Sequence, residues 1–151
     1  MNISPILIAE DNANDALLLR KAFEDNHAVN PIVLVENGEE AINFLLAEGK
    51  FKGREFPALF LLDLRMPVKD GLEVLQWLSE HPEIPEKLPV VVLSSAEVPE
   101  KVQMNYARNI QACLVKPTGY PELRDRIRIL KEYWLDYVAC EDGNAPAAAN
   151  P

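Results

Sequence analysis

The sequence predicts an α/β fold in which helices cover both faces of a five-stranded parallel sheet. Two observations carry this prediction. Short apolar segments alternate along the chain with segments of helical periodicity, and the apolar segments contain no alternating polar residues. Strands of this kind are buried on both faces, which is typical of a doubly wound parallel sheet. Right-handed crossovers then bring the carboxyl ends of all the strands to one edge.

The predicted strands are the short apolar segments. They comprise residues 5–9, 32–35, 59–62, 90–93 and 112–115. The first strand is stopped by Glu10–Asp11, and the third ends in the single carboxylate of Asp63. The fourth closes on Ser94–Ser95, and the fifth ends at Lys116–Pro117. Polar side chains are therefore expected at the shared edge of the sheet.

Five helices follow the strands, each identified by apolar residues at helical spacing. The apolar faces comprise Leu18, Leu19, Ala22 and Phe23; Ala41, Phe44 and Leu45; Val74, Leu75 and Leu78; Val98, Val102 and Tyr106; and Leu123, Ile127, Leu130, Trp134 and Val138. Asn37 is a predicted N-cap with Glu40 at N3, and Asp15 is an acid near the positive end of the first helix. Residues 139–151 have too little apolar surface to dock. We expect one folded domain over residues 1–138 and a flexible tail over residues 139–151.

Composition limits the range of functions. The 151 residues include 48% hydrophobic residues, enough for one domain with its own core. A net charge of -9 repels phosphate backbones and disfavours nucleic-acid binding. The two cysteines form no disulfide framework, and no stretch has the pattern of a membrane span or signal peptide. We therefore expect a cytoplasmic protein that binds neither nucleic acid nor a membrane.

The polar groups at the strand ends predict a phosphoryl site with a metal ion. They are Glu10, Asp11, Asp63, Ser94 and Lys116. Carboxylates so close together repel one another unless a cation joins them, and Mg²⁺ prefers such oxygen ligands. A phosphoryl group would complete the coordination of the metal, with Lys116 and Ser94 holding its remaining oxygens.

This set of residues resembles the receiver domain of two-component response regulators, over about residues 5 to 138. The resemblance implies a flavodoxin-like sheet with strand order 2-1-3-4-5. It implies that Asp63 accepts a phosphoryl group from a histidine kinase or a phosphotransfer protein. It further implies Mg²⁺ bound by Asp11, Asp63 and the main-chain carbonyl of Arg65, with Glu10 acting through water.

The resemblance also assigns the remaining groups. Lys116 would contact a phosphoryl oxygen, and Ser94, preferred here over Ser95, would move to hydrogen-bond it. The Lys116–Pro117 bond is commonly cis in this family. Receivers usually carry Tyr or Phe three residues before the lysine, where this chain has Cys113. The aromatic switch is then missing or supplied by another residue such as Tyr106, and Cys113 is expected to be buried and not catalytic.

The last helix points to partners. Ile129, Tyr133 and Tyr137 add apolar width beside the core-facing residues, which predicts a homodimer through this region. The Tyr133–Trp134 extension and short tail resemble single-domain regulators that are paired with bacterial phytochrome kinases. The expected kinase is then a bacteriophytochrome, and the expected output is protein contact.

Two other functions compete with the phosphoacceptor switch. A phosphatase of the haloacid dehalogenase type needs a second Asp two positions after the nucleophile, and Arg65 occupies that position. A phosphorylation-independent interaction module, or degenerate receiver, is disfavoured by the complete set of Asp11, Asp63 and Lys116. We expect no enzymatic activity beyond self-phosphorylation and autodephosphorylation.

Overall fold

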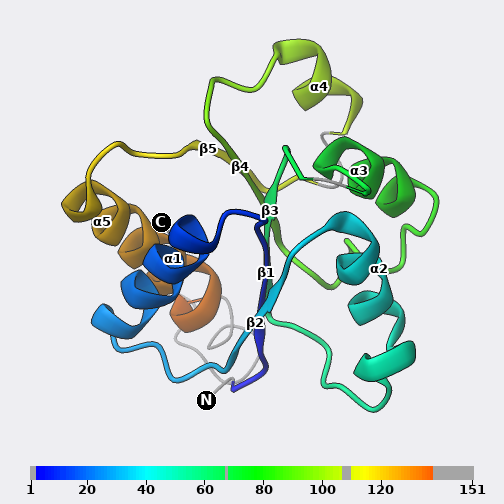
Figure 1. Ribbon diagram of the computed structural model, residues 1–151, viewed down its shortest axis with the longest axis horizontal. Coiled ribbons are helices and arrows are strands. Elements are labelled where there is room, and N and C mark those ends of the chain that lie inside the picture. Colours follow the sequence, from blue (N-terminus) through cyan, green and yellow to red (C-terminus); the bar gives the residue numbers. More distant parts are fainter. Residues whose placement is uncertain (1–2, 67, 107–109, 138–151) are drawn as a thin grey trace.

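A parallel five-stranded sheet runs through the centre of the computed structural model, which describes residues 3–66, 68–106 and 110–137 (Figure 1). The strand order is β2-β1-β3-β4-β5, as predicted. The strands are β1 (Ile6–Ala9), β2 (Ile32–Val35), β3 (Leu59–Asp63), β4 (Val90–Ser94) and β5 (Ala112–Val115). The predicted tail and Val138 lie outside the described residues.

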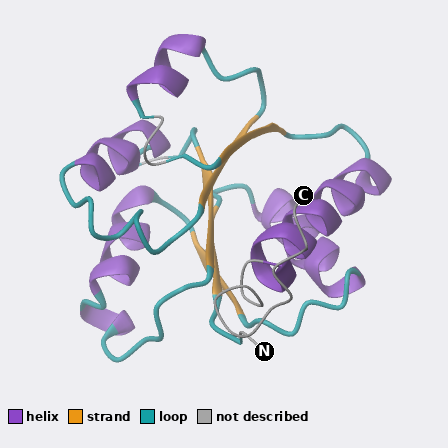
Figure 2. Cartoon of the chain, turned by 180° about the vertical axis from the view of Figure 1, so that it is seen from behind, coloured by secondary structure: helices purple, strands orange, loops and turns teal. Residues whose placement is uncertain are grey.

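Helices cover both faces of the sheet (Figures 1 and 2). One face is covered by α1 (Ala13–Asp25) and α5 (Tyr120–Leu130). The other is covered by α2 (Gly38–Leu46), α3 (Gly71–Ser79) and α4 (Glu100–Asn105). Successive side chains of β1 point to opposite faces of the sheet. Ile6 and Ile8 pack in the core beside α1, whereas Leu7 and Ala9 pack beside α2 and α3. The doubly wound architecture is confirmed.

Burial follows the position of each strand in the sheet. All residues of β1 and β3 are buried, as are the first four residues of β4. The edge strands β2 and β5 are only partly buried, because each has one neighbour in place of two. The prediction of strands buried on both faces is therefore right for the centre of the sheet, where the site lies.

Two predicted helices differ from the structure. Leu18 lies within α1 but is 40% exposed, while Leu19 and Phe23 belong to the buried face of that helix. Val98 is buried but precedes α4, so it is not part of that helix.

The last helix changes geometry near its end. After α5 the chain continues as a π-helical segment, η2 (Lys131–Tyr137). A π-turn spaces residues by five positions in place of four, which moves the buried row by one residue. Leu135 is buried after Leu130, and Trp134 is only half-buried. Leu135 therefore takes the fully buried position, and Trp134 packs, partly buried, against the same core cluster.

Tight packing fixes the end of β3 against α3. Asp70 caps α3 in a reciprocal pair with Glu73, and the Gly71 N–H donates to the Leu64 carbonyl at 3.1 Å. A Cβ atom on Gly71 would lie 2.5 Å from the Asp63 carbonyl oxygen. Only glycine lets the helix approach the strand end this closely, so Gly71 helps to place Asp63.

The N-cap of α2 is as predicted, because the Asn37 side chain accepts a hydrogen bond from the Glu40 N–H at 2.8 Å. Among the described residues, no helix combines the length and apolar character needed to cross a membrane.

Candidate functional site

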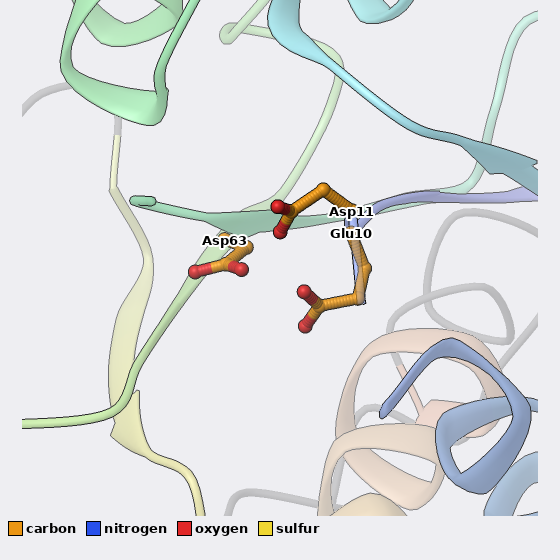
Figure 3. Close-up of side chains that lie close together, drawn as sticks. All are labelled: Glu10, Asp11 and Asp63. Carbon is orange, nitrogen blue, oxygen red and sulfur yellow. The ribbon is translucent and has the colours of Figure 1, made fainter. Parts of the chain in front are cut away.

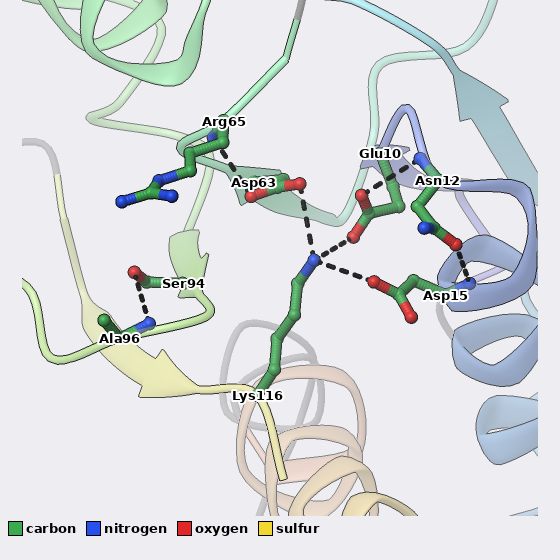
Figure 4. Close-up of polar contacts among 8 residues, drawn as sticks. All are labelled: Glu10, Asn12, Asp15, Asp63, Arg65, Ser94, Ala96 and Lys116. Carbon is green, nitrogen blue, oxygen red and sulfur yellow. Dashed lines mark hydrogen bonds and ion pairs between the residues drawn. The ribbon is translucent and has the colours of Figure 1, made fainter. Parts of the chain in front are cut away.

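Polar side chains collect at the carboxyl edge of the sheet, as the strand order requires (Figure 4). In the parallel register Ala9 aligns with Leu62, which places Glu10 beside Asp63. Asp63 aligns in turn with Leu93, one residue before Ser94. Lys116 follows the last residue of β5 and reaches back toward β1 and β3.

Three carboxylates gather around one small space (Figure 3). One oxygen from each of Glu10, Asp11 and Asp63 lies within 4.8 Å of the others. Glu10 and Asp63 are 3% and 4% exposed, whereas Asp11 is open to solvent. This set of oxygen ligands, with one side open to water, fits a hard divalent cation that keeps part of its water shell.

Lys116 is the cation of the site. Its Nζ donates to Glu10 Oε1 at 2.6 Å, to Asp15 Oδ2 at 3.1 Å and to Asp63 Oδ2 at 3.4 Å. These three bonds use all the N–H groups of an ammonium. Lys116 therefore offsets the negative charge of two buried carboxylates that would otherwise be costly to bury together.

Asp15 is the residue of this network that the sequence did not assign to the site. The sequence predicts Asp15 only as a favourable charge at the start of the first helix. Its N–H is held by the side chain of the N-cap Asn12 at 3.0 Å, which directs the first turn of α1 toward the site. The available signal was an acid one turn beyond a strand-end carboxylate pair.

Burial changes the ionisation of this group of residues. Burial raises the pKa of the Glu10 carboxyl group to about 7, and Asp63 acts in the same direction, while Lys116 acts against it. Burial lowers the pKa of Lys116, but its hydrogen bond with Glu10 and the charges of Glu10 and Asp63 bring the pKa above its ordinary value. Lys116 is therefore charged at neutral pH, where Glu10 titrates.

Arg65 and Ser94 lie at the border of the network. The main-chain N–H of Arg65 donates to Asp63 Oδ1 at 3.1 Å, and the Arg65 side chain is exposed. The Ser94 hydroxyl accepts from the Ala96 N–H at 3.2 Å, so it is turned toward its own loop (Figure 4). The main-chain N–H of Lys116 donates to the Ser94 carbonyl at 2.7 Å, which joins the ends of β4 and β5.

Three further expectations concern β5 and its neighbours. Cys113 is partly buried, less than expected, and burial raises the pKa of its thiol, which disfavours a reactive thiolate. The Tyr106 hydroxyl donates to Gln76 on α3 at 3.2 Å, which ties the end of α4 to α3. The expectation of a cis bond at Lys116–Pro117 is wrong, since no peptide bond among the described residues is cis. The trans form is the lower-energy isomer even before proline.

The site and fold agree with a known family. A family model of the response regulator receiver domain matches residues 6–128. The chain belongs to the response regulator receiver domain family. This receiver is 35% identical to the probable methanogenesis regulatory protein FilR2 of Methanothrix harundinacea, over 87% of this chain and 84% of the relative. It is 29% identical to response regulator Rcp1 of Synechocystis sp., over 88% of this chain and 90% of Rcp1.

Solved structures point to the same group of proteins. The phosphorylated cyanobacterial phytochrome response regulator RcpA matches the receiver with a TM-score of 0.79 and 30% identity, covering 89% of this chain and 95% of RcpA. The Mn²⁺-bound form of Rcp1 matches with a TM-score of 0.78 and 28% identity, covering 95% of this chain and 99% of that one. The expected similarity to phytochrome-associated response regulators is confirmed.

The raised pKa of Glu10 predicts a pH-dependent stability in the metal-free protein. Between pH 4.5, the ordinary pKa, and about pH 7, the unfolded chain has lost the Glu10 proton while the folded chain keeps it. Because the folded state binds more protons, stability falls as pH rises through this window. We expect the free energy of unfolding of wild type to fall by about 1 to 3 kcal/mol relative to Glu10→Gln.

Urea denaturation of both proteins in EDTA, at several pH values across this window, measures the difference. Groups that titrate alike in both proteins do not contribute to the difference between their free energies of unfolding. Parallel stability curves would contradict the assignment of a raised pKa to Glu10.

Proposed function

We propose that this receiver is a phosphoacceptor switch, in which Asp63 accepts a phosphoryl group from a sensor histidine kinase or a phosphotransfer protein in a Mg²⁺-dependent reaction. The observation that carries the proposal is the position of the Asp63 carboxylate. It is nearly buried at the end of the central strand β3, beside the acidic pair Glu10–Asp11 and 3.4 Å from the ammonium of Lys116. The Asp63 carboxylate therefore has acidic groups next to it that can hold a cation and an ammonium next to it that can hold an anion.

The carboxylate cluster is the proposed metal site. Asp11, Asp63 and the main-chain carbonyl of Arg65 would hold Mg²⁺, with Glu10 acting through water. The spacing of the three carboxylate oxygens and the Mn²⁺-bound form of Rcp1 support this proposal. A bound Mg²⁺ would neutralise charge on the phosphoryl oxygens during transfer.

Two contacts orient the Asp63 carboxylate for the reaction. The Arg65 N–H holds Asp63 Oδ1, while Oδ2 faces Lys116. One carboxylate oxygen forms a bond to phosphorus as the bond between phosphorus and the donor breaks. Lys116 then supplies an N–H to a phosphoryl oxygen. The Ser94 hydroxyl would leave the Ala96 N–H to make a second hydrogen bond, and this exchange would carry the signal to the loop after β4.

The proposed setting is a phytochrome-type pathway in the cytoplasm. The similarity to RcpA and Rcp1 supports a bacteriophytochrome as the kinase. We propose further that residues 1–138 form the receiver and residues 139–151 a flexible tail. Output would occur through contact with other proteins.

Phosphorylation of Asp63 is tested with a small donor. After incubation with acetyl phosphate and Mg²⁺, wild type should gain the mass of one phosphoryl group, and Asp63→Asn should gain none. Asp70→Asn is the matched control, because it removes a nearby acid and leaves an efficient N-cap on α3. It should be phosphorylated like wild type. If wild type and Asp63→Asn gain the same mass, or if neither gains mass, Asp63 is not the phosphoacceptor. A phosphorylation-independent module would then be favoured.

We also propose a homodimer that involves the last helix. Ile129 on α5 is 50% exposed, which supports an apolar contact with a second copy. Of the other residues expected there, Tyr133 is half-buried beside Trp134, and the Tyr137 side chain lies outside the described part of the molecule.

Sedimentation tests this interface. Wild type should sediment as a dimer at high concentration, and Ile129→Glu should shift it toward monomer. Leu17→Glu, at a 61% exposed position on α1, should not. A wild-type monomer with and without a phosphoryl analogue would rule the homodimer out.

A further inference from the structure

The ion pair between Asp15 and Lys116 has no role in the phosphoryl chemistry described above. Asp15 lies in the first turn of α1, and Lys116 follows β5. We propose that Asp15 is a positioning residue that holds Lys116 in its resting position and so opposes the phosphorylated state. This inference rests on the proposed function of Asp63.

The position of Asp15 is fixed by the same turn that carries the acidic pair. The Asn12 side chain accepts from the Asp15 N–H at 3.0 Å, and the Asn12 N–H donates to Glu10 Oε2 at 3.3 Å. Asn12 therefore holds the Glu10 carboxylate and the main chain of Asp15, the two residues of the β1–α1 side that bind Lys116 (Figure 4). Asp15 is held as part of the site and does not merely reach it from the surface.

The three N–H groups of the Lys116 ammonium are all in use before any phosphoryl group arrives. The longest of the three contacts is the one to Asp63, at 3.4 Å, against 3.1 Å to Asp15 and 2.6 Å to Glu10. A phosphoryl oxygen on Asp63 therefore competes with the partners that Lys116 already has. The contact to Asp63 itself can pass to a phosphoryl oxygen, but an ammonium that moves out toward that oxygen draws away from Glu10 or Asp15.

Burial decides which of Glu10 and Asp15 Lys116 releases. The side chain of Glu10 is 1% exposed, so losing Lys116 would leave a buried carboxylate without its cation. The side chain of Asp15 is 41% exposed, so water can replace Lys116 there. Asp15 is thus the partner that Lys116 gives up, and the strength of their ion pair sets part of the cost of switching.

Beryllium fluoride, an analogue of a phosphoryl group on a carboxylate, tests the inference. Its binding would be measured by ¹⁹F NMR at saturating Mg²⁺, so that differences in metal affinity do not contribute. Asp15→Asn removes the charge but retains the shape of the side chain. A partly exposed ion pair of ordinary strength predicts that Asp15→Asn binds the analogue about two- to fivefold more tightly than wild type.

Two variants separate the ion pair from general effects of charge. Glu39→Gln removes an exposed acid from the first turn of α2, at the same edge of the sheet but without an ion pair to Lys116. It should bind the analogue like wild type. Asp15→Glu keeps the charge and should restore wild-type affinity. In metal-free protein, the ammonium ¹H–¹⁵N signal of Lys116 should shift in Asp15→Asn and not in Glu39→Gln.

The outcomes distinguish this inference from the proposed function. Failure of wild type to bind the analogue would overturn both. Binding by wild type with equal affinity for Asp15→Asn, or with an equal gain in Glu39→Gln, would overturn only the role of Asp15. An unchanged Lys116 signal in Asp15→Asn would overturn it as well.

Discussion

The site depends on one electrostatic compensation, in which Lys116 offsets carboxylates that the sheet buries. Glu10 and Asp63 are nearly inaccessible to solvent and lie at neighbouring strand ends. Two such groups repel each other and lose hydration, and the ammonium of Lys116 contacts both. Lys116 lies far along the chain from Glu10, so only the parallel order of the strands brings the pair together. The fold therefore brings in the cation that allows these carboxylates to be buried together.

The same compensation links stability to function. A buried carboxylate that already has a cationic partner can exchange this partner for a metal ion, and the ammonium released in this way can bind an anionic phosphoryl group. The neighbouring structure limits how far the groups can move. Gly71 fixes the end of β3, and Asn12 fixes the turn after β1. The exchange of partners at Lys116 is then the main change that a metal ion or a phosphoryl group can cause in the site.

Much of this arrangement was predictable, because its causes are local. Continuous apolar segments predict buried strands, and a polar residue after each strand lies at the shared edge of a parallel sheet. What was missed depends on three-dimensional detail. The pairing of Asp15 with Lys116 requires the direction of α1, and the burial of Leu135 requires a π-turn. The orientation of the Ser94 hydroxyl depends on a loop hydrogen bond to Ala96, which no periodicity in the sequence indicates.

The compensation by Lys116 is tested most directly by the free energy of unfolding of Lys116→Met and wild type, each measured in EDTA and in excess Mg²⁺. Without Lys116 the carboxylates lack a cation, so the variant should gain more stability from Mg²⁺ than wild type does, by about 1 kcal/mol or more. An equal gain in the two proteins would contradict the claim that Lys116 and a metal ion offset the same buried charges.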